Sequence, residues 1–494
     1  MTRIETSGRN VLADLDQRVP TSFYWSLTLL ATIGGFLFGY DTANIGSALP
    51  FVPYSLNGFA LGYLVAGASL GAAAGALLAG PLADRFGRKS LLVTDALIYA
   101  LGAILSAVTP NSTVLLIART LIDLAIGADS AIATAYIAEY APRNRRGALS
   151  MLQQWMITVG ILAAFVVALI ILWALPHSAG TVDWRLILGL GAVPALIGLA
   201  LRTRMPESPR WLLRHGKYEE TRRALGRLGT EASLEDVHFT ARQLQSADRR
   251  GEHVRRRMWT TGVKTALIVV CAFFVFQQIT GINVPLYYGP KLLGPLFQAG
   301  SSKVAATMAG VEVTAIIAAV NVIATYFAFR WIDRIGRRKL AMGGYAGMCA
   351  AALISAPGLL LLSGLPRIIL VMIALNAFVA SFAIGVGGTG WLIQGEVFPT
   401  GVRGQAAAVG ASVDWIANFA LIEVFPTWQT GIGLGWIMVC FAALCLLAIA
   451  FVHRFLPETK NRSVEEITQL FEKQADSGAG PRAEGPPARG AAAA

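Results

Sequence analysis

The chain has 494 residues, of which 55% are hydrophobic and only 14% are charged. A soluble core of this size could not hide so much apolar surface, so a lipid bilayer is expected to cover the remainder. The net charge of +12 would suggest nucleic acid binding in a soluble protein. Here the cations lie in short loops beside long apolar runs, which indicates topology determinants, and no nucleic acid partner is expected.

Twelve apolar runs are roughly as long as a transmembrane helix, which needs about 17 to 25 residues. We expect these spans at 23–46, 59–81, 90–109, 113–137, 151–175, 186–202, 264–288, 304–328, 340–363, 367–392, 405–428 and 432–455. Lys and Arg follow spans two, four and eight and are missing after spans one, three and eleven. Because cationic loops resist translocation, both chain termini are predicted to be cytoplasmic.

Three phrases occur twice in the same order. DRFGRK at 84–89 returns as DRIGRRK at 333–339, Glu139 with Arg146 returns as Glu396 with Arg403, and PES at 206–208 returns as PET at 457–459. The second copy follows the first by about 250 residues, which indicates two parallel repeats of six helices. The sequence therefore predicts an all-α membrane protein with twelve transmembrane helices in two six-helix pseudo-repeats. Duplicated helical membrane proteins are mostly transporters.

Polar stretches divide the chain further. Residues 203–262 are rich in Arg, Lys and Glu with helical patterning, whereas the end of the chain is rich in Gly, Ala and Pro and cannot bury enough surface to fold. We expect a cytoplasmic N-terminal segment at 1–22, an N-terminal six-helix bundle at 23–202, a cytoplasmic helical linker at 203–262, a C-terminal six-helix bundle at 263–456 and a cytoplasmic tail at 457–494, disordered from about 477.

Two opposite charges lie inside predicted spans. Asp41 belongs to span one and Arg119 lies near the start of span four. A charge in hydrocarbon costs several kcal/mol unless it is paired or hydrated, so both residues are functional candidates. An ion pair that only fixes helix packing is one interpretation. We favour proton coupling, because a lone carboxylate beside one arginine can exchange a proton for an ion pair as hydration changes.

Span seven contains an unusual run of polar residues, QQITGINVPLYY, with Gln277, Gln278, Asn283 and Tyr287. Amides are costly to bury unsatisfied, and they supply both the donors and the acceptors that a ring of sugar hydroxyls requires. Hydrogen bonding between helices is the alternative. Further amides and indoles in other spans are Gln154, Trp391, Trp415 and Asn418. Either tryptophan alone would more often be an interfacial anchor, but an indole can also stack on a sugar ring.

The repeated loops carry acidic residues as well as cations. We expect Asp84 and Asp333, together with their Arg neighbours, to pair across the bundle with Glu139, Arg146, Glu396 and Arg403. Such pairs would close the cytoplasmic side of the protein and would have to break for it to open. Topology anchoring is the competing interpretation, although orientation requires only the cations. The predicted cytoplasmic gate comprises Asp84, Arg85, Arg88, Glu139, Arg146, Asp333, Arg334, Arg337, Glu396 and Arg403.

Motifs of other protein classes are missing from the sequence. It contains no GxxxxGK[ST] phosphate loop, no zinc motif and no plausible Ser, His and Asp arrangement. We therefore expect neither an enzyme nor an ATP-driven pump, and no metal or other cofactor apart from protons as the coupling ion.

Eight phrases together are similar to those of a known family: GGFLFGYD, DRFGRK, YIAEYAPRNRRG, PESPRWLL, QQITGIN, DRIGRRK, GEVFPTGVRG and PETKN. From about Gly34 to Glu466 the chain resembles the sugar porters of the major facilitator superfamily, which include proton-coupled xylose carriers and glucose facilitators. The resemblance implies that Asp41 matches the aspartate that accepts protons in symporters and that Arg119 matches its partner. It also implies sugar contacts at Gln154, Gln277, Gln278, Asn283, Trp391, Asp414 and Trp415, with Phe38, Tyr287 and Asn418 lining the same cavity and Asn321 close to the ligand.

The chain departs from this family in several places. Asp414 stands where an amide or a small polar residue is usual, and Asp123 and Asp129 replace small residues in span four. Asp123 follows Arg119 by one helical turn and is expected to compete with Asp41 for it. Glu312 and Glu423 add carboxylates at membrane depth, and in GVGGTGW at 385–391 glycines stand where the family has prolines. Independently of the resemblance, four glycines within six positions favour a broken helix in span ten.

The sequence as a whole predicts a monomeric, proton-coupled monosaccharide symporter of the plasma (inner) membrane that works by alternating access. A passive sugar or polyol facilitator, in which Asp41 is structural, is the first alternative, and a transporter-like nutrient sensor is the second. The Asp414 carboxylate disfavours sugar acids and leaves neutral sugars, polyols and amino sugars open.

Overall fold

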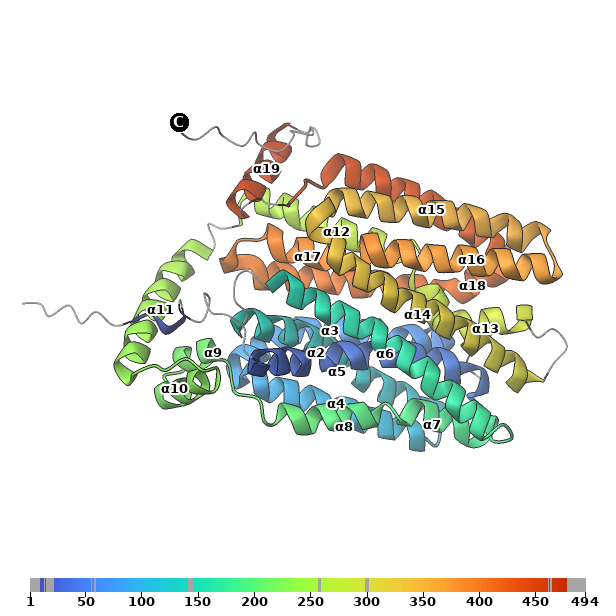
Figure 1. The fold of residues 1–494 in the computed structure, drawn as a ribbon, viewed down its shortest axis with the longest axis horizontal. Coiled ribbons are helices and arrows are strands. Elements are labelled where there is room, and N and C mark those ends of the chain that lie inside the picture. The colour runs from blue at the N-terminus through green and yellow to red at the C-terminus, as the bar shows by residue number, and fades with distance from the viewer. Residues whose placement is uncertain are drawn as a thin grey trace, which may run out of the picture.

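The computed structural model describes residues 9–12, 14, 22–54, 56, 59–140, 146–255, 259–297, 302–460, 462 and 464–477. Within these ranges the secondary structure is helical, and no strand is found. Figure 1 shows long helices lying roughly side by side, with those of the N-terminal half in blue to green and those of the C-terminal half in yellow to red. The helices between the two halves, within residues 209–255, and the last helix, 464–477, lie at one end of this bundle, which we call the linker end.

The N-terminal half contains six membrane crossings. Five are single helices: α2 (Ser22–Ala48), α3 (Phe59–Phe86), α4 (Arg88–Val108), α5 (Ser112–Tyr140) and α6 (Arg146–Ala174). The sixth crossing is assembled from the π-turn η2 (Ala179–Asp183), α7 (Trp184–Gly189) and α8 (Ala192–Arg202).

The C-terminal half repeats this arrangement with more interruptions. Its elements are α12 (Thr261–Ile279), α13 (Asn283–Phe297), α14 (Lys303–Ile335), α15 (Arg337–Leu361), α16 (Gly364–Phe382), the π-turn η3 (Ala383–Gly387), α17 (Gly388–Val397) and α18 (Thr400–Phe455). The pair α12 and α13 forms one crossing, as does the run from α16 to α17. Gly433 has φ of 79° inside α18, which breaks this long element into two crossings.

Length and apolar character identify most of these crossings as membrane spans. Eight helices in the described ranges are long and apolar enough on their own, and nine if the bent α3 is included. The second arm of α18, α2 and α5 bring the number of membrane crossings to twelve. The charges of Arg119, Asp123 and Asp129 make α5 less apolar. The predicted all-α fold of twelve transmembrane helices in two halves is confirmed.

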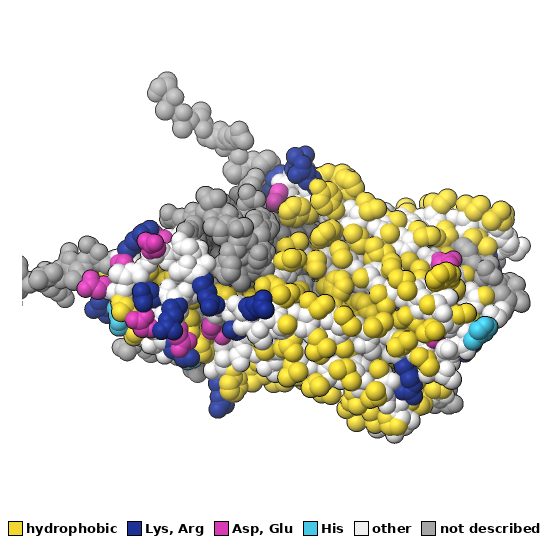
Figure 2. All heavy atoms as spheres, turned by 60° about the horizontal axis from the view of Figure 1, so that its bottom comes forward, with side chains coloured by type: hydrophobic (Ala, Val, Ile, Leu, Met, Phe, Trp, Pro, Cys, Tyr) yellow, Lys and Arg dark blue, Asp and Glu magenta, His cyan; other side chains and the backbone are white. Residues whose placement is uncertain are grey.

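Figure 2 shows hydrophobic side chains covering the face formed by the long helices, while Lys, Arg, Asp and Glu gather at the linker end. On the long helices of the C-terminal half, Ile268, Ile323 and Ile373 are each more than half exposed. Apolar patches of such extent mark contact with lipid or another apolar partner.

The linker helices are α9 (Pro209–Arg214), α10 (Tyr218–Arg227) and α11 (Leu234–Arg255). At the same end of the bundle α19 (Val464–Ser477) packs against α12 (Figure 1). Ser208 caps α9, since its hydroxyl accepts a hydrogen bond from the Trp211 amide at 3.3 Å, and Pro209 occupies the first helical position. The Trp211 indole donates to the Asp84 carbonyl at 2.9 Å, which fastens α9 to the end of α3.

The repeated PES and PET phrases have a common structural role. Glu207 accepts a hydrogen bond from the Arg88 amide at 3.0 Å, and Glu458 accepts one from the Arg337 amide at 2.9 Å. Each carboxylate therefore lies at the N-terminus of the helix that follows the repeated basic loop, where the helix dipole favours a negative charge. The sharp entry into these helices is made by glycines with φ of 96° at Gly87 and 101° at Gly336.

The described part of the N-terminal segment packs on the linker. Val11 and Leu12 are buried with Leu213 and Val237. The Arg9 amide donates to Asp236 at 2.8 Å, and this hydrogen bond is the main reason why the pKa of Asp236 lies below its ordinary value. Residues 1–8 and 478–494, including the expected disordered tail, lie outside the described residues.

Candidate functional site

A cavity lies between the two halves of the protein, with about 780 Å³ of empty space when the solvent at its opening is included. Its walls come from α2 and α6 of the N-terminal half and from α12 to α14 and α16 to α18 of the C-terminal half. All the predicted substrate contacts line this cavity except Tyr287: Phe38, Gln154, Gln277, Gln278, Asn283, Asn321, Trp391, Asp414, Trp415 and Asn418.

The break between α12 and α13 brings three amides into the cavity. Gly281 has φ of 93°, which L side chains rarely adopt, and the chain turns there so that α12 ends and α13 begins at Asn283. Gln277 and Gln278 thus come from the last turn of one helix and Asn283 from the first turn of the next. Irregular backbone inside a membrane protein is tolerated where it lines such a cavity.

Span ten differs from the sequence prediction. The chain is not broken at 385–391 but continues through the wider π-turn η3 into α17. Gly385 packs against the backbone of α15, since a Cβ there would meet the Gly344 Cα atom at 2.5 Å. Close helix packing therefore accounts for this glycine. The π-turn leaves the Gly387 carbonyl accessible to Gln277, whose Nε2 donates to it at 2.9 Å.

The polar wall of the cavity is a connected chain of hydrogen bonds. Gln278 donates from Nε2 to Asp414 Oδ1 at 2.7 Å, and Asn283 donates from Nδ2 to Gln278 Oε1 at 2.9 Å. The same Asn283 amide group donates to Asn418 Oδ1 at 2.9 Å, and Asn418 donates to Ser69 Oγ at 2.7 Å. Ser69 belongs to α3, so the chain joins the C-terminal half to the N-terminal half. Sequence reasoning missed Ser69, because a small polar residue in a glycine-rich span carries little signal.

Aromatic side chains supply the apolar part of the cavity. Phe38 of α2 and Trp415 of α18 meet edge to face with ring centroids 4.9 Å apart. Trp391 packs on Phe274 with centroids 5.1 Å apart. The first pair crosses between the halves, so any change in their relative orientation alters the cavity wall.

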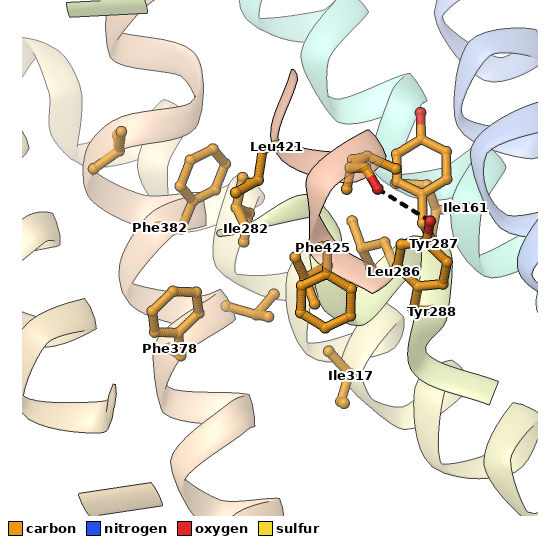
Figure 3. Packing of buried hydrophobic residues seen from close by; sticks show 14 of the residues in the cluster. Ile161, Ile282, Leu286, Tyr287, Tyr288, Ile317, Phe378, Phe382, Leu421 and Phe425 are labelled. Carbon is orange, nitrogen blue, oxygen red and sulfur yellow. Dashed lines mark hydrogen bonds between the residues drawn. The ribbon is translucent and has the colours of Figure 1, made fainter. Parts of the chain in front are cut away.

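Tyr287 lies behind the cavity wall instead of on it. It is buried on α13, where Figure 3 shows it beside Leu286 and Ile161. Its hydroxyl is hydrogen-bonded to Thr42, which does line the cavity. The dashed line in Figure 3 marks the hydrogen bond from the neighbouring Tyr288 hydroxyl to the Ile422 carbonyl at 3.1 Å.

A second, fully apolar hollow of about 470 Å³ lies between α13, α15, α16 and α18. Its lining includes Leu293, Leu375 and Met438 and contains no exposed polar surface. A hydroxylated ligand would find no hydrogen-bond partners there.

Asp41 and Arg119 form a fully buried ion pair between α2 and α5. Arg119 donates to both carboxylate oxygens, with 2.7 Å between Nη2 and Oδ2, and both residues are at most 2% exposed. A bidentate pair of this kind is strong and directional. Phe38 and Thr42 lie within one turn of Asp41 on α2 and line the cavity, so the pair adjoins the cavity wall.

A second carboxylate accompanies this pair. Asp123 follows Arg119 by one turn of α5 and is fully buried, and neither of its oxygens accepts a hydrogen bond from the described residues. Asp123 also packs on α3, where a Cβ at Gly71 would come within 2.7 Å of the Asp123 Cβ. The cluster thus contains two carboxylates and one guanidinium, as the sequence suggested.

A further buried cluster surrounds Arg202 of α8. Its Nη1 lies 2.9 Å from Asp95 Oδ1 of α4, and its Nη2 lies 2.6 Å from Asp129 Oδ1 of α5. Asp129 follows Arg119 by ten residues, or about 15 Å along the helix towards the linker end. Sequence reasoning noticed Asp129 but missed Asp95 and Arg202, whose charges inside spans three and six were the available signal.

The predicted gate residues form two similar clusters at the linker end. Arg88 lies 2.9 Å from Asp84 and 3.2 Å from Glu139, while Arg337 lies 2.9 Å from Asp333 and 2.7 Å from Glu396. In the described part of the chain, each of these ion pairs joins helices of one half and not the two halves.

The remaining gate residues take part in other contacts. The Arg85 guanidinium lies 5.2 Å from the Phe86 ring centroid, and Arg403 donates to the Phe398 carbonyl at 2.9 Å. The Arg334 carbonyl accepts a hydrogen bond from Lys460 at 2.6 Å. The side chain of Arg146 lies outside the described residues.

The two other carboxylates singled out from the sequence do not reach the cavity. Glu312 is exposed on α14. Glu423 is half-buried on α18, and a Cβ at Gly62 of α3 would collide with its carboxylate. Glu423 therefore lies at a contact between the two halves.

Comparison with known proteins gives a consistent result. The family model for sugar (and other) transporters matches residues 27–471. The chain is 33% identical to an arabinose-proton symporter of Bacillus subtilis, with 94% of this chain and all of the relative covered. It is 34% identical to the glucose transporter GlcP of Staphylococcus epidermidis, over 89% of this chain and 95% of that one.

Solved structures agree in the fold. The proton:xylose symporter XylE bound to 6-bromo-6-deoxy-D-glucose matches with a TM-score of 0.74 and 28% identity, over 92% of this chain and 100% of that chain. A partially occluded, inward-open form of XylE from E. coli matches with a TM-score of 0.76 and 27% identity, over 90% of this chain and 100% of that one. The protein is therefore not an enzyme but a multi-pass membrane transporter, and the chain belongs to the sugar porter family of the major facilitator superfamily.

Proposed function

We propose that this protein is a proton-coupled monosaccharide symporter that works by alternating access. The observation that carries the proposal is the position of the Asp41 and Arg119 pair, buried in the membrane within one turn of cavity-lining residues. A relative is described as an arabinose-proton symporter and a structural neighbour as a proton:xylose symporter, which supports the same activity here.

The cavity wall is suited to a hydroxylated ring. Gln154, Gln277 and Asn321 offer amide groups, and Trp391 and Trp415 offer flat apolar faces. Amides bind the hydroxyls at the rim of a sugar while an indole covers its C–H face. This combination fixes orientation through polar groups and gains affinity through the apolar ones.

The proton acts on the buried pair. When Asp41 takes up a proton from the outside, its bond to Arg119 weakens, and the guanidinium can move towards Asp123 one turn away. Because Phe38 and Thr42 share this turn of α2, movement of the pair reaches the cavity wall and the Phe38 contact with Trp415. Release of the proton to the cytoplasm restores the pair and resets the carrier.

The clusters around Arg88 and Arg337 stabilise the linker end of each half in this cycle. They fasten consecutive helices within one half, so each half can move as a unit while the contacts between the halves change. In this proposal the linker end faces the cytoplasm, both termini lie there, and one chain is the functional unit in the plasma membrane.

The proposal is tested by measuring proton movement directly. Sealed, de-energised vesicles that contain the protein receive D-xylose, L-arabinose or D-glucose, and the pH of the medium is recorded. Symport predicts that the medium becomes more alkaline as protons enter with the sugar, with the same response from the exposed-site control Glu312→Gln. Rapid exchange of labelled sugar without any proton movement would instead establish a passive facilitator.

A further inference from the structure

Asp414 is the one ionisable side chain among the described residues that line the cavity. It is only 5% exposed, and the side chain that hydrogen-bonds to it is the neutral Gln278. No Lys, Arg or His is among the described residues that line the cavity, and the buried guanidinium of Arg119 is already held by both oxygens of Asp41. A buried carboxylate without a positive partner is costly, so this site favours a ligand that brings one.

The hydrogen-bond chain fixes which atoms the cavity offers to a ligand. A carboxylate only accepts hydrogen bonds, so Gln278 must turn its NH₂ group to Asp414 and its oxygen to Asn283. Gln277 gives its NH₂ group to the Gly387 carbonyl, which leaves its Oε1 buried without a partner among the described residues. On the Asp414 side of the cavity, the acceptors left for a ligand are therefore the Asp414 carboxylate and Gln277 Oε1. Gln154 and Asn321, elsewhere on the wall, offer donors as well as acceptors.

One buried hydrogen-bond donor also lacks a partner. The Trp415 indole N–H, from the residue next to Asp414, has no partner within the described ranges. The part of a ligand that meets this side of the cavity therefore presents donors to Asp414 and Gln277 and an acceptor to Trp415.

We infer that the cavity prefers a monosaccharide bearing a protonated amine, with the ammonium group on Asp414 and a neighbouring hydroxyl between Gln277 and Trp415. An ammonium group has three donors, no acceptor and the charge that Asp414 lacks, whereas a hydroxyl supplies only one donor. This inference rests on the proposed sugar-transport function and narrows it to amino sugars.

Four related sugars should differ in affinity according to the charge that each brings to Asp414. D-Glucosamine and D-glucose differ by one amine in place of one hydroxyl, so their comparison isolates the charge. N-Acetyl-D-glucosamine keeps the nitrogen but loses the charge, and D-glucuronate carries a carboxylate that Asp414 repels.

The experiment is calorimetric titration of the purified full-length protein with these four sugars. For the wild type we expect D-glucosamine to bind about tenfold more tightly than D-glucose, in line with a charge-assisted contact. N-Acetyl-D-glucosamine is expected to bind no better than D-glucose, and D-glucuronate more weakly than either. In Asp414→Asn the affinities for D-glucosamine and D-glucose should agree within about twofold, while Glu312→Gln, an equivalent change at an exposed site, keeps the preference.

Equal affinity of the wild type for D-glucosamine and D-glucose overturns the inference, as does a preference that survives in Asp414→Asn. If Asp414→Asn does not fold, the wild-type comparison of D-glucosamine with D-glucose still decides. Binding of D-glucose without an amine preference refutes only this inference, whereas failure of all four sugars and of D-xylose to bind refutes the proposed function as well.

Discussion

Replacing Arg202 by methionine is expected to be highly destabilising, although Arg202 lies outside the cavity. Its guanidinium is 2.9 Å from Asp95, 2.6 Å from Asp129 and 2.9 Å from the Leu92 carbonyl, and all three charged groups are almost fully buried. Methionine has a similar length but no charge, so the change leaves two buried carboxylates without a cation. Removing one partner of a buried pair costs about 3–5 kcal/mol.

The opposite single change should cost far less. Asp129→Asn leaves one carboxylate facing one guanidinium, and the asparagine oxygen can still accept a hydrogen bond, so we expect a loss of about 0–2 kcal/mol. The triple variant Arg202→Met, Asp95→Asn and Asp129→Asn carries no charge at this site and should recover most of the stability lost in Arg202→Met, since neutral replacement of a buried cluster is often tolerated.

The assay is the temperature at which the purified protein in mild detergent loses its monodisperse peak on size-exclusion chromatography. The expected order of stability is wild type, Asp129→Asn, the triple variant and then Arg202→Met. If Arg202→Met is as stable as Asp129→Asn, or if the triple variant is no better than Arg202→Met, charge balance does not govern this site and the reasoning is refuted.

Three further changes have defined outcomes. Gly281→Ala should reduce the yield of folded protein, because φ is 93° there and a Cβ would collide with the Phe441 ring, with a cost of about 1–3 kcal/mol; unchanged yield contradicts this. Trp415→Ala should weaken sugar binding about tenfold in the same titrations while Trp415→Phe keeps part of the affinity, and equal affinities of the two variants would exclude ring stacking. Asp236→Ala should remove the protection of the Arg9 amide in hydrogen exchange. Because the pKa of Asp236 is lowered from 3.8, this contact should persist in the wild type at pH 4 and be lost only as the pH falls further; earlier loss contradicts it.

The fold and many site residues could be predicted from the sequence because polar residues are rare in membrane spans and are therefore easy to recognise. A charge such as Asp41 or Arg119, or an amide such as Gln278, stands out in a span that is otherwise apolar. The repeated loops also indicated two equivalent halves, and the Glu207 and Glu458 contacts give both copies the same physical role.

Which of these polar residues contact each other was harder to predict. Arg202 and Asp95 are 107 residues apart, and which faces of their helices meet depends on helix rotation. In a soluble protein the apolar stripe fixes this rotation, but lipid is as apolar as the core, so the sequence pattern carries much less of this information. The same reason explains why Ser69 was missed and why Tyr287, on a helix with cavity-lining neighbours, lies behind the wall.

Local glycine patterns were also ambiguous. The four glycines at 385–390 suggested a broken helix, whereas Gly385 serves close packing on Gly344 and the chain continues through a π-turn. Gly281, in contrast, does mark a break, because its positive φ interrupts span seven between α12 and α13. Sequence alone does not distinguish a glycine needed for space from a glycine needed for its backbone angle.

The central claim is that protonation of Asp41 couples sugar movement to the proton gradient. It is tested most directly by sugar accumulation in proteoliposomes with an inward proton gradient, compared between the wild type and Asp41→Asn, with exchange at equilibrium measured in parallel. The account predicts that the wild type concentrates the sugar, whereas Asp41→Asn only equalises it across the membrane and still exchanges it. Accumulation above the external concentration by Asp41→Asn would contradict the account.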